Sequence, residues 1–174
     1  MKWRNHRLVS GTAVFVMTGH LLPALCAACG SIFPDAIEGR NYSSPSWKKH
    51  HRKESHYLLA YVILCSFLWS MVLDHHTVWN FMQLSIASLF QPKMLLLFVG
   101  YLSFWFFIGS ILHILEDALC GKIPFYSLRH PIGIRLFYVG TEKEYLVAYL
   151  LTGLLISFRI LACVFTDLSF SQGI

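Results

Sequence analysis

Two residues near the middle of the chain have the types and spacing of a metal-binding pair. His113 and Asp117 form an H-x-x-x-D pattern at the end of a long apolar run. Four residues turn an α-helix by about 400°, so both side chains lie on one helix face. An imidazole and a carboxylate on one face can bind a divalent cation, and the same pair can equally form an ordinary hydrogen bond. The spacing permits a metal site without requiring one.

Other imidazoles and carboxylates flank the apolar runs. His51 and His56 precede the second run and lie about 140° apart on a helix, so we expect His51 in the approaching loop and His56 in the first turn. Asp35 closes the first run in a Pro-Asp pair, where it could also cap a turn. His6 lies at the opposite end of that run. Four further candidate ligands of a mixed nitrogen and oxygen site are therefore available.

The elements that must position these residues are membrane helices. Of 174 residues, 56% are hydrophobic and 13% are charged, whereas soluble domains carry about 25% charged residues. A helix that crosses the hydrocarbon core needs about 20 apolar residues. Apolar stretches occupy residues 8–33, 57–73, 94–115 and 145–165, and a weaker patch at 77–90 suits a short interfacial helix. We expect an all-α integral membrane protein, residues 1–174 forming a single membrane-embedded domain, with three to four transmembrane helices.

The distribution of basic residues predicts which connections face the cytoplasm. Segments 35–56 and 121–144 are rich in Lys and Arg, whereas Lys93 is the single basic residue between the second and third stretches. Basic loops are retained on the cytoplasmic side, which also accounts for the net charge of +5. No basic helix or known nucleic-acid motif supports a nucleic-acid partner.

The first apolar stretch has two possible paths. If it crosses the membrane, the basic residues at its start fall on the outer side, against the charge rule. If it turns back between Gly19-His20 and Pro23, they join the cytoplasmic set. We favour this helical hairpin. It brings His6 to the same membrane face as the other candidate ligands.

The candidate motifs together resemble a known family. They are His6, a G-S-x-x-P-D ending at Asp35, an H-R-x-x-S-H from His51 to His56, the H-x-x-x-D, and a G-T-E-K-E starting at Gly140. Their order resembles the YdjM-like group of bacterial inner-membrane proteins, described as LexA-regulated, membrane-bound metal-dependent hydrolases. The sequence departs from the family where a second acid is replaced by Ile37 and a common Thr by Cys120. The order is also similar to that of zinc-dependent phospholipase C enzymes, although their second helical H-x-x-x-E is missing.

The resemblance implies a divalent-metal-dependent hydrolase in the bacterial inner membrane. The predicted ligands are His6, Asp35, His51, His56, His113 and Asp117. Histidines with carboxylates favour zinc over manganese or iron. Arg52 could neutralise an anionic substrate, which we expect to be a phosphoester or a phospholipid headgroup, and Glu54 and Glu116 are candidate general bases by proximity. The alternative is a non-catalytic membrane protein, such as an accessory subunit or small transporter, whose His and Asp residues form interhelical hydrogen bonds.

Overall fold

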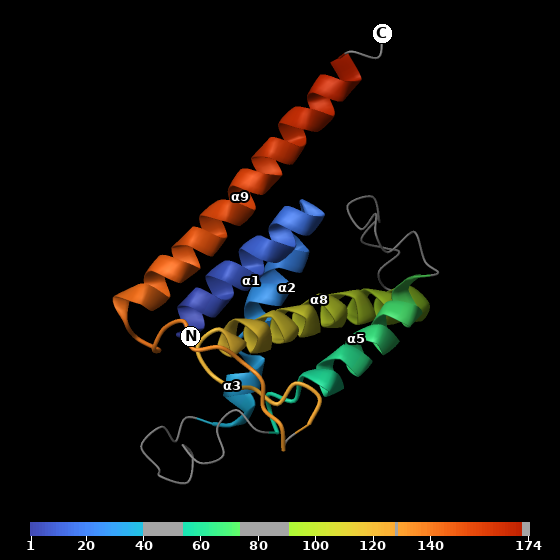
Figure 1. The fold of residues 1–174 in the computed structure, drawn as a ribbon. Helices are drawn as coiled ribbons and strands as arrows, with labels where there is room; N and C mark the ends of the chain where they lie inside the picture. The colour runs from blue at the N-terminus through green and yellow to red at the C-terminus, as the bar shows by residue number, and fades with distance from the viewer. Residues whose placement is uncertain (40–53, 74–90, 128, 172–174) are drawn as a thin grey trace.

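The chain folds into a set of helices connected by irregular segments (Figure 1). The computed structural model describes residues 1–39, 54–73, 91–127 and 129–171, with side chains up to residue 165. The helices are α1 (Trp3–Thr18), α2 (Leu21–Gly30), α3 (Phe33–Ile37), α5 (Leu58–Leu73), α8 (Pro92–Ala118) and α9 (Glu142–Ser171). The all-α fold class is confirmed. The interfacial helix predicted at 77–90 lies outside the described residues.

The first apolar stretch forms a helical hairpin. α1 ends at Thr18 because Gly19 adopts a left-handed φ of 71° and its N–H donates to the Phe15 carbonyl. α2 then carries Pro23 in its first turn, where helical N–H groups have no partner within the helix. The two helices pack side by side, with α2 running back toward the start of α1 (Figure 1). The predicted reversal at Gly19-His20 is confirmed.

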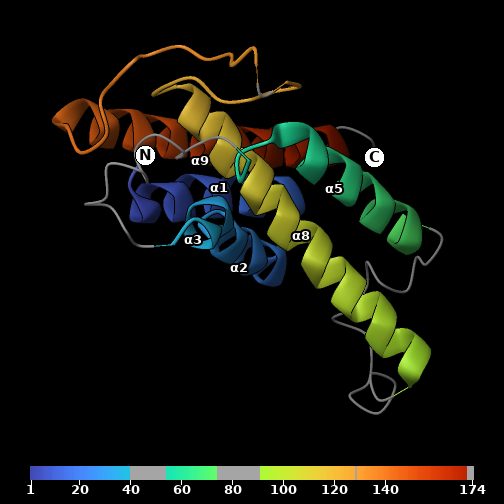
Figure 2. The same cartoon turned by 90° about the horizontal axis from the view of Figure 1, so that it is seen from below.

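A close crossing of α2 and α8 sets the position of the segment that follows α2. A Cβ at Gly30 would lie 1.8 Å from the Phe106 carbonyl oxygen, and one at Gly109 would lie 2.0 Å from that of Ala27. Ser110 Oγ also donates a hydrogen bond of 2.9 Å to the Gly30 carbonyl. Small residues let helix backbones approach in this way inside membranes. The crossing brings α3, directly after α2, against the last turns of α8 (Figure 2).

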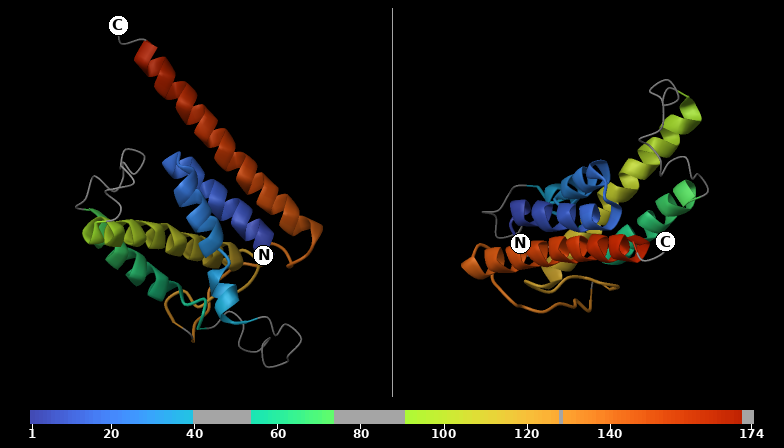
Figure 3. Two further views of the ribbon diagram at one scale, coloured as in Figure 1. Left: turned by 180° about the vertical axis from the view of Figure 1, so that it is seen from behind. Right: turned by 90° about the horizontal axis from the view of Figure 1, so that it is seen from above.

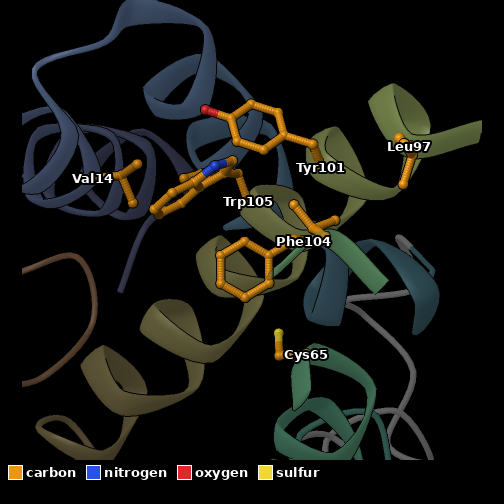
Figure 4. Close-up of a cluster of buried hydrophobic side chains, with 8 residues drawn as sticks. Val14, Cys65, Leu97, Tyr101, Phe104 and Trp105 are labelled. Atoms are coloured by element: carbon orange, nitrogen blue, oxygen red, sulfur yellow. The ribbon is translucent and has the colours of Figure 1, made fainter. Parts of the chain in front are cut away.

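The main apolar core surrounds α8. Tyr101, Phe104 and Trp105 of α8 are buried, together with Val14 of α1 and Cys65 of α5. Figure 4 shows Trp105 turned toward Val14 and Phe104 lying on the Cys65 side. α8 therefore joins the hairpin on one side to α5 on the other.

Two of the described helices are long and apolar enough to cross a membrane. They are Pro92–Ala118 and Glu142–Phe165. The second predicted span, 57–73, is the 16-residue α5, about 24 Å long against a hydrocarbon core of about 30 Å. α9 packs along α1 and continues well beyond it (Figure 3), with almost none of its span buried in the protein.

The start of α9 is tied to the start of α1. Glu144 is fully buried and accepts hydrogen bonds from the Asn5 side chain, at 2.7 Å, and from the Lys2 backbone N–H. The connection from α8 to α9 is irregular, with isolated antiparallel bridges between Cys120 and Arg135 and between Ile123 and Ile132. Both ends of this connection are thus fixed to the helical bundle.

Candidate metal centre

Four potential ligand atoms converge where α3, α5 and α8 meet. They are Asp35 Oδ1, His56 Nε2, His113 Nε2 and Asp117 Oδ2, and the four donor groups lie within 4.8 Å of one another. Asp35 comes from α3, and His56 comes from the loop just before α5. His113 and Asp117 come from the last turns of α8. We call this set the four-ligand group.

The spacing within the four-ligand group fits a tetrahedral cation. His56 Nε2 lies 3.2 Å from His113 Nε2 and 3.5 Å from an oxygen of each carboxylate. His113 Nε2 lies 3.6 Å from Asp35 Oδ1 and 3.8 Å from Asp117 Oδ2. Ligands that bind a tetrahedral zinc ion at about 2.0–2.2 Å are separated from one another by about 3.3–3.6 Å. A single ion can therefore contact all four atoms with small movements.

The hydrogen bonding of these atoms also fits a bound cation. Asp35 Oδ1 is buried and has no hydrogen-bond partner among the described residues. The two imidazole nitrogens face each other at 3.2 Å, although a neutral imidazole nitrogen without a proton is only an acceptor. A divalent ion would satisfy the three atoms together, and the two carboxylates would neutralise its charge.

A carboxylate supports His56 from the opposite side of its ring. His56 Nδ1 lies 2.8 Å from Ser55 Oγ and 3.3 Å from Glu38 Oε1. Ser55 Oγ also donates a hydrogen bond to Glu38. A carboxylate on the remote nitrogen of a metal-binding histidine fixes its tautomer and ring orientation. Glu38 and Ser55 therefore hold His56 Nε2 toward the four-ligand group.

His6 lies beside the four-ligand group, next to His113 and Asp117. Its ring contacts that of His113 at a tilt of 36°, with centroids 3.9 Å apart, and its Nε2 lies 3.4 Å from Asp117 Oδ1. His6 Nδ1 is 2.6 Å from Glu116 Oε2, and Ser10 Oγ donates to the other Glu116 oxygen at 2.9 Å. Residues of α1 thus brace the end of α8 that carries His113 and Asp117. The Met1 amino group donates to the same Asp117 oxygen at 2.6 Å.

The electrostatics of the centre favour positive charge. Burial alone would raise the pKa of Asp35, but the adjacent imidazoles of His113 and His56 outweigh it and hold that pKa well below its ordinary value. Burial alone would lower the pKa of His56, but Asp117, Asp35 and Glu38 outweigh it and raise that pKa to about 10. The carboxylates around His56 thus favour positive charge at this position, and a bound cation would supply such a charge.

The structure places some predicted site residues together and others apart. Asp35, His56, His113 and Asp117 lie together in the structure, and His6 lies beside them. Their role as metal ligands stays a prediction. Predicted roles in catalysis remain predictions: the Glu116 carboxylate contacts His6 and Ser10, and Glu54 is exposed. His51 and Arg52 lie outside the described residues.

Sequence reasoning missed the supporting residues of the centre. Glu38 lies one residue after Ile37, which stands at the position of the family's second acid, and its carboxylate reaches His56. Ser55 belongs to the H-R-x-x-S-H motif, but no role was predicted for it. Ser10 carried no signal, because an isolated serine in an apolar run has many ordinary roles.

The comparison with protein families identifies the family of the chain. A model of the YdjM inner membrane protein family matches residues 1–166, which include every described residue of the metal centre. The search of curated proteins found no match, and neither did the search of solved structures. Since the match spans nearly the whole sequence, the chain belongs to the YdjM inner membrane protein family and is an inner-membrane protein.

Proposed function

We propose that this protein is a divalent-metal-dependent hydrolase that acts on a phosphoester or phospholipid at the cytoplasmic membrane face. The observation that carries the proposal is the buried four-ligand group, whose donor atoms have the spacing of a tetrahedral site. Two imidazoles with two carboxylates favour zinc, with manganese and iron as further candidates. A bound cation would polarise the scissile group and lower the pKa of water toward 7.

Access to the centre supports catalysis over a purely structural role. The His56 and His113 side chains are fully buried, whereas those of Asp35 and Glu38 are 15% and 12% exposed. A substrate would therefore approach from the side of α3. Catalytic metal sites keep one coordination position open, whereas structural sites are closed. The partly exposed Asp35 is the ligand that could move to open such a position.

The residues in and around the centre have different parts in this proposal. His113 and Asp117 present their donor atoms from one helix face, and Glu38 orients His56 through the remote ring nitrogen. Glu116, held by His6 and Ser10, keeps the end of α8 in register with α1. The proposed role of Arg52 is to neutralise the charge of an anionic substrate.

Metal analysis of the purified protein tests the proposal. We expect stoichiometric zinc, manganese or iron in the wild-type protein, together with hydrolysis of bis(p-nitrophenyl) phosphate in detergent. His113→Ala and Asp117→Asn should each lose the metal and the activity while remaining inserted in the membrane. His130→Ala is the matched control, because His130 is an exposed residue of the connection between α8 and α9.

The same measurements distinguish the hydrolase function from a non-catalytic role of the His and Asp residues. A structural His–Asp hydrogen bond contributes about 1–3 kcal/mol to stability and needs no ion. If the wild-type protein contains no metal, or if both variants keep it, the hydrolase proposal fails and the non-catalytic role replaces it. If metal is present but no phosphodiester is hydrolysed, the proposed substrate class is wrong.

A further inference from the structure

A second candidate site lies between the α8–α9 connection and the start of α9. It is a pocket of about 420 Å³, lined by residues 135–138 on one side and 141–143 on the other. Its cations are Arg135 and Lys143, and its acid is Glu142. Neither cation forms an ion pair with any residue in the described part of the chain. The pocket is therefore open to an anionic ligand.

This pocket is distinct from the metal centre but is connected to it. Arg135 pairs with Cys120 in an antiparallel bridge, and the Leu136 N–H donates to the Leu119 carbonyl at 2.8 Å. Cys120 Sγ lies 3.5 Å from Asp117 Oδ1. The backbone that forms one wall of the pocket is thus attached to the residues that directly follow Asp117.

The surroundings of the pocket are apolar and exposed. The connection joins the two candidate spans, so it lies at a membrane surface. Large side chains along it are 45–66% exposed, namely Phe125, Tyr126, Ile132, Ile134, Leu136 and Tyr138. Contiguous exposed apolar surface marks contact with a membrane or partner, and aromatic side chains interleaved with Lys and Arg are typical of the headgroup layer.

The pocket and its surroundings together select the ligand. The Arg135 guanidinium lies 5.6 Å from the centre of the Tyr138 ring, an arrangement that holds a cation in place beside an apolar surface. Further along α9, after the pocket residues 141–143, the apolar residues Leu146 and Leu150 are 58% and 62% exposed. Phosphate oxygens could meet the two cations while acyl chains follow these leucines into the bilayer.

We propose that this pocket binds the phosphate of an anionic phospholipid from the same membrane, with Arg135 and Lys143 as its cationic contacts. The site does not depend on hydrolysis at the metal centre. The bound lipid would lie beside the centre, because one wall of the pocket is hydrogen-bonded to the backbone that follows Asp117.

Native mass spectrometry of the detergent-purified full chain tests this site. The probes are phosphatidylglycerol, phosphatidylcholine and inorganic phosphate, each added separately. The wild-type protein should prefer phosphatidylglycerol. The double variant Arg135→Gln/Lys143→Gln should bind it roughly tenfold more weakly or worse, because charge-assisted hydrogen bonds are removed. Glu142→Gln should bind it more tightly, because a repelling charge is lost.

The matched control is the double variant Lys122→Gln/Arg129→Gln. It removes the same charge from exposed positions of the same connection outside the pocket, and should change phosphatidylglycerol binding less than twofold. An unchanged thermal unfolding temperature in detergent shows that each variant is folded. Unchanged binding in Arg135→Gln/Lys143→Gln, equal losses in both double variants, or inorganic phosphate binding as tightly as the lipid would each overturn the proposal. Absence of metal from the wild-type protein would instead refute the hydrolase function and leave the lipid measurement valid.

Discussion

Glu38 Oε1 lies 3.3 Å from His56 Nδ1, on the side of the imidazole ring opposite the four-ligand group. This contact predicts a measurable effect from a residue that does not touch the ion. Loss of a carboxylate behind a metal-binding histidine typically weakens metal affinity 10–100-fold. We expect this loss in Glu38→Gln, measured by competition with a chelating dye. Glu142→Gln, which removes an exposed acid elsewhere, should keep wild-type affinity, and equal affinity in the two variants would refute a positioning role for Glu38.

The α2–α8 crossing should be sensitive to a single methyl group. A Cβ at Gly109 would lie 2.0 Å from the Ala27 carbonyl oxygen, so Gly109→Ala must push the two helices apart. Overpacking of this kind costs about 1–3 kcal/mol or more, and it moves Asp35 away from α8. Thermal unfolding in detergent and metal content should both fall. Gly153→Ala is the control, because a Cβ there has nothing within 4 Å. An unchanged melting temperature in Gly109→Ala would show that the crossing is looser than described.

Replacement of His6 tests whether its side chain supports the end of α8 or binds the metal directly. His6→Ala removes one of the two partners that the described residues supply to the buried Glu116 carboxylate, and leaves Ser10. Such a loss destabilises a protein by about 1–3 kcal/mol. We expect a lower melting temperature with the metal retained, since the four-ligand group is intact. His130→Ala should change neither quantity. Loss of the metal from His6→Ala would add His6 to the ligands, as the sequence predicted.

The structure predicts that the start of α1 and the start of α9 lie on the same side of the membrane. The start of α1 is hydrogen-bonded to the start of α9 through Asn5 and Glu144, and the charge rule places both in the cytoplasm. Cysteines introduced at Lys2 and Ser127 should resist an impermeant thiol reagent in intact cells and react in inverted vesicles. Rapid labelling of either cysteine from outside would contradict the assigned orientation.

Local periodicity was enough to predict part of the centre. The four-residue spacing of His113 and Asp117 requires a shared helix face, and their donor atoms lie 3.8 Å apart. The reversal at Gly19 was predictable because a glycine and a nearby proline interrupt an apolar run whose start is basic. Both inferences depend on neighbouring residues in the chain.

Contacts between distant segments could not be predicted in this way. Asp35 meets His113 because backbones approach at Gly30 and Gly109, yet glycines are frequent in membrane helices and do not identify their partners. The true start of α9 at Glu142 was placed three residues late, at 145. The acids of its first turn stabilise the helix N-terminus but lower the local hydropathy on which the prediction rested.

The hydrogen bonds to Glu144 have a consequence for the order of synthesis. The ribosome finishes the hairpin early, but its anchor to α9 exists only after residue 144 has been translated. In the same way, Asp35 and His56 are made well before the partners at 113 and 117 that complete their centre. A nascent chain arrested before residue 113 would carry only half of the four-ligand group. Completion of the centre must therefore follow synthesis of α8, and attachment of the N-terminal hairpin to α9 must wait for translation of residue 144.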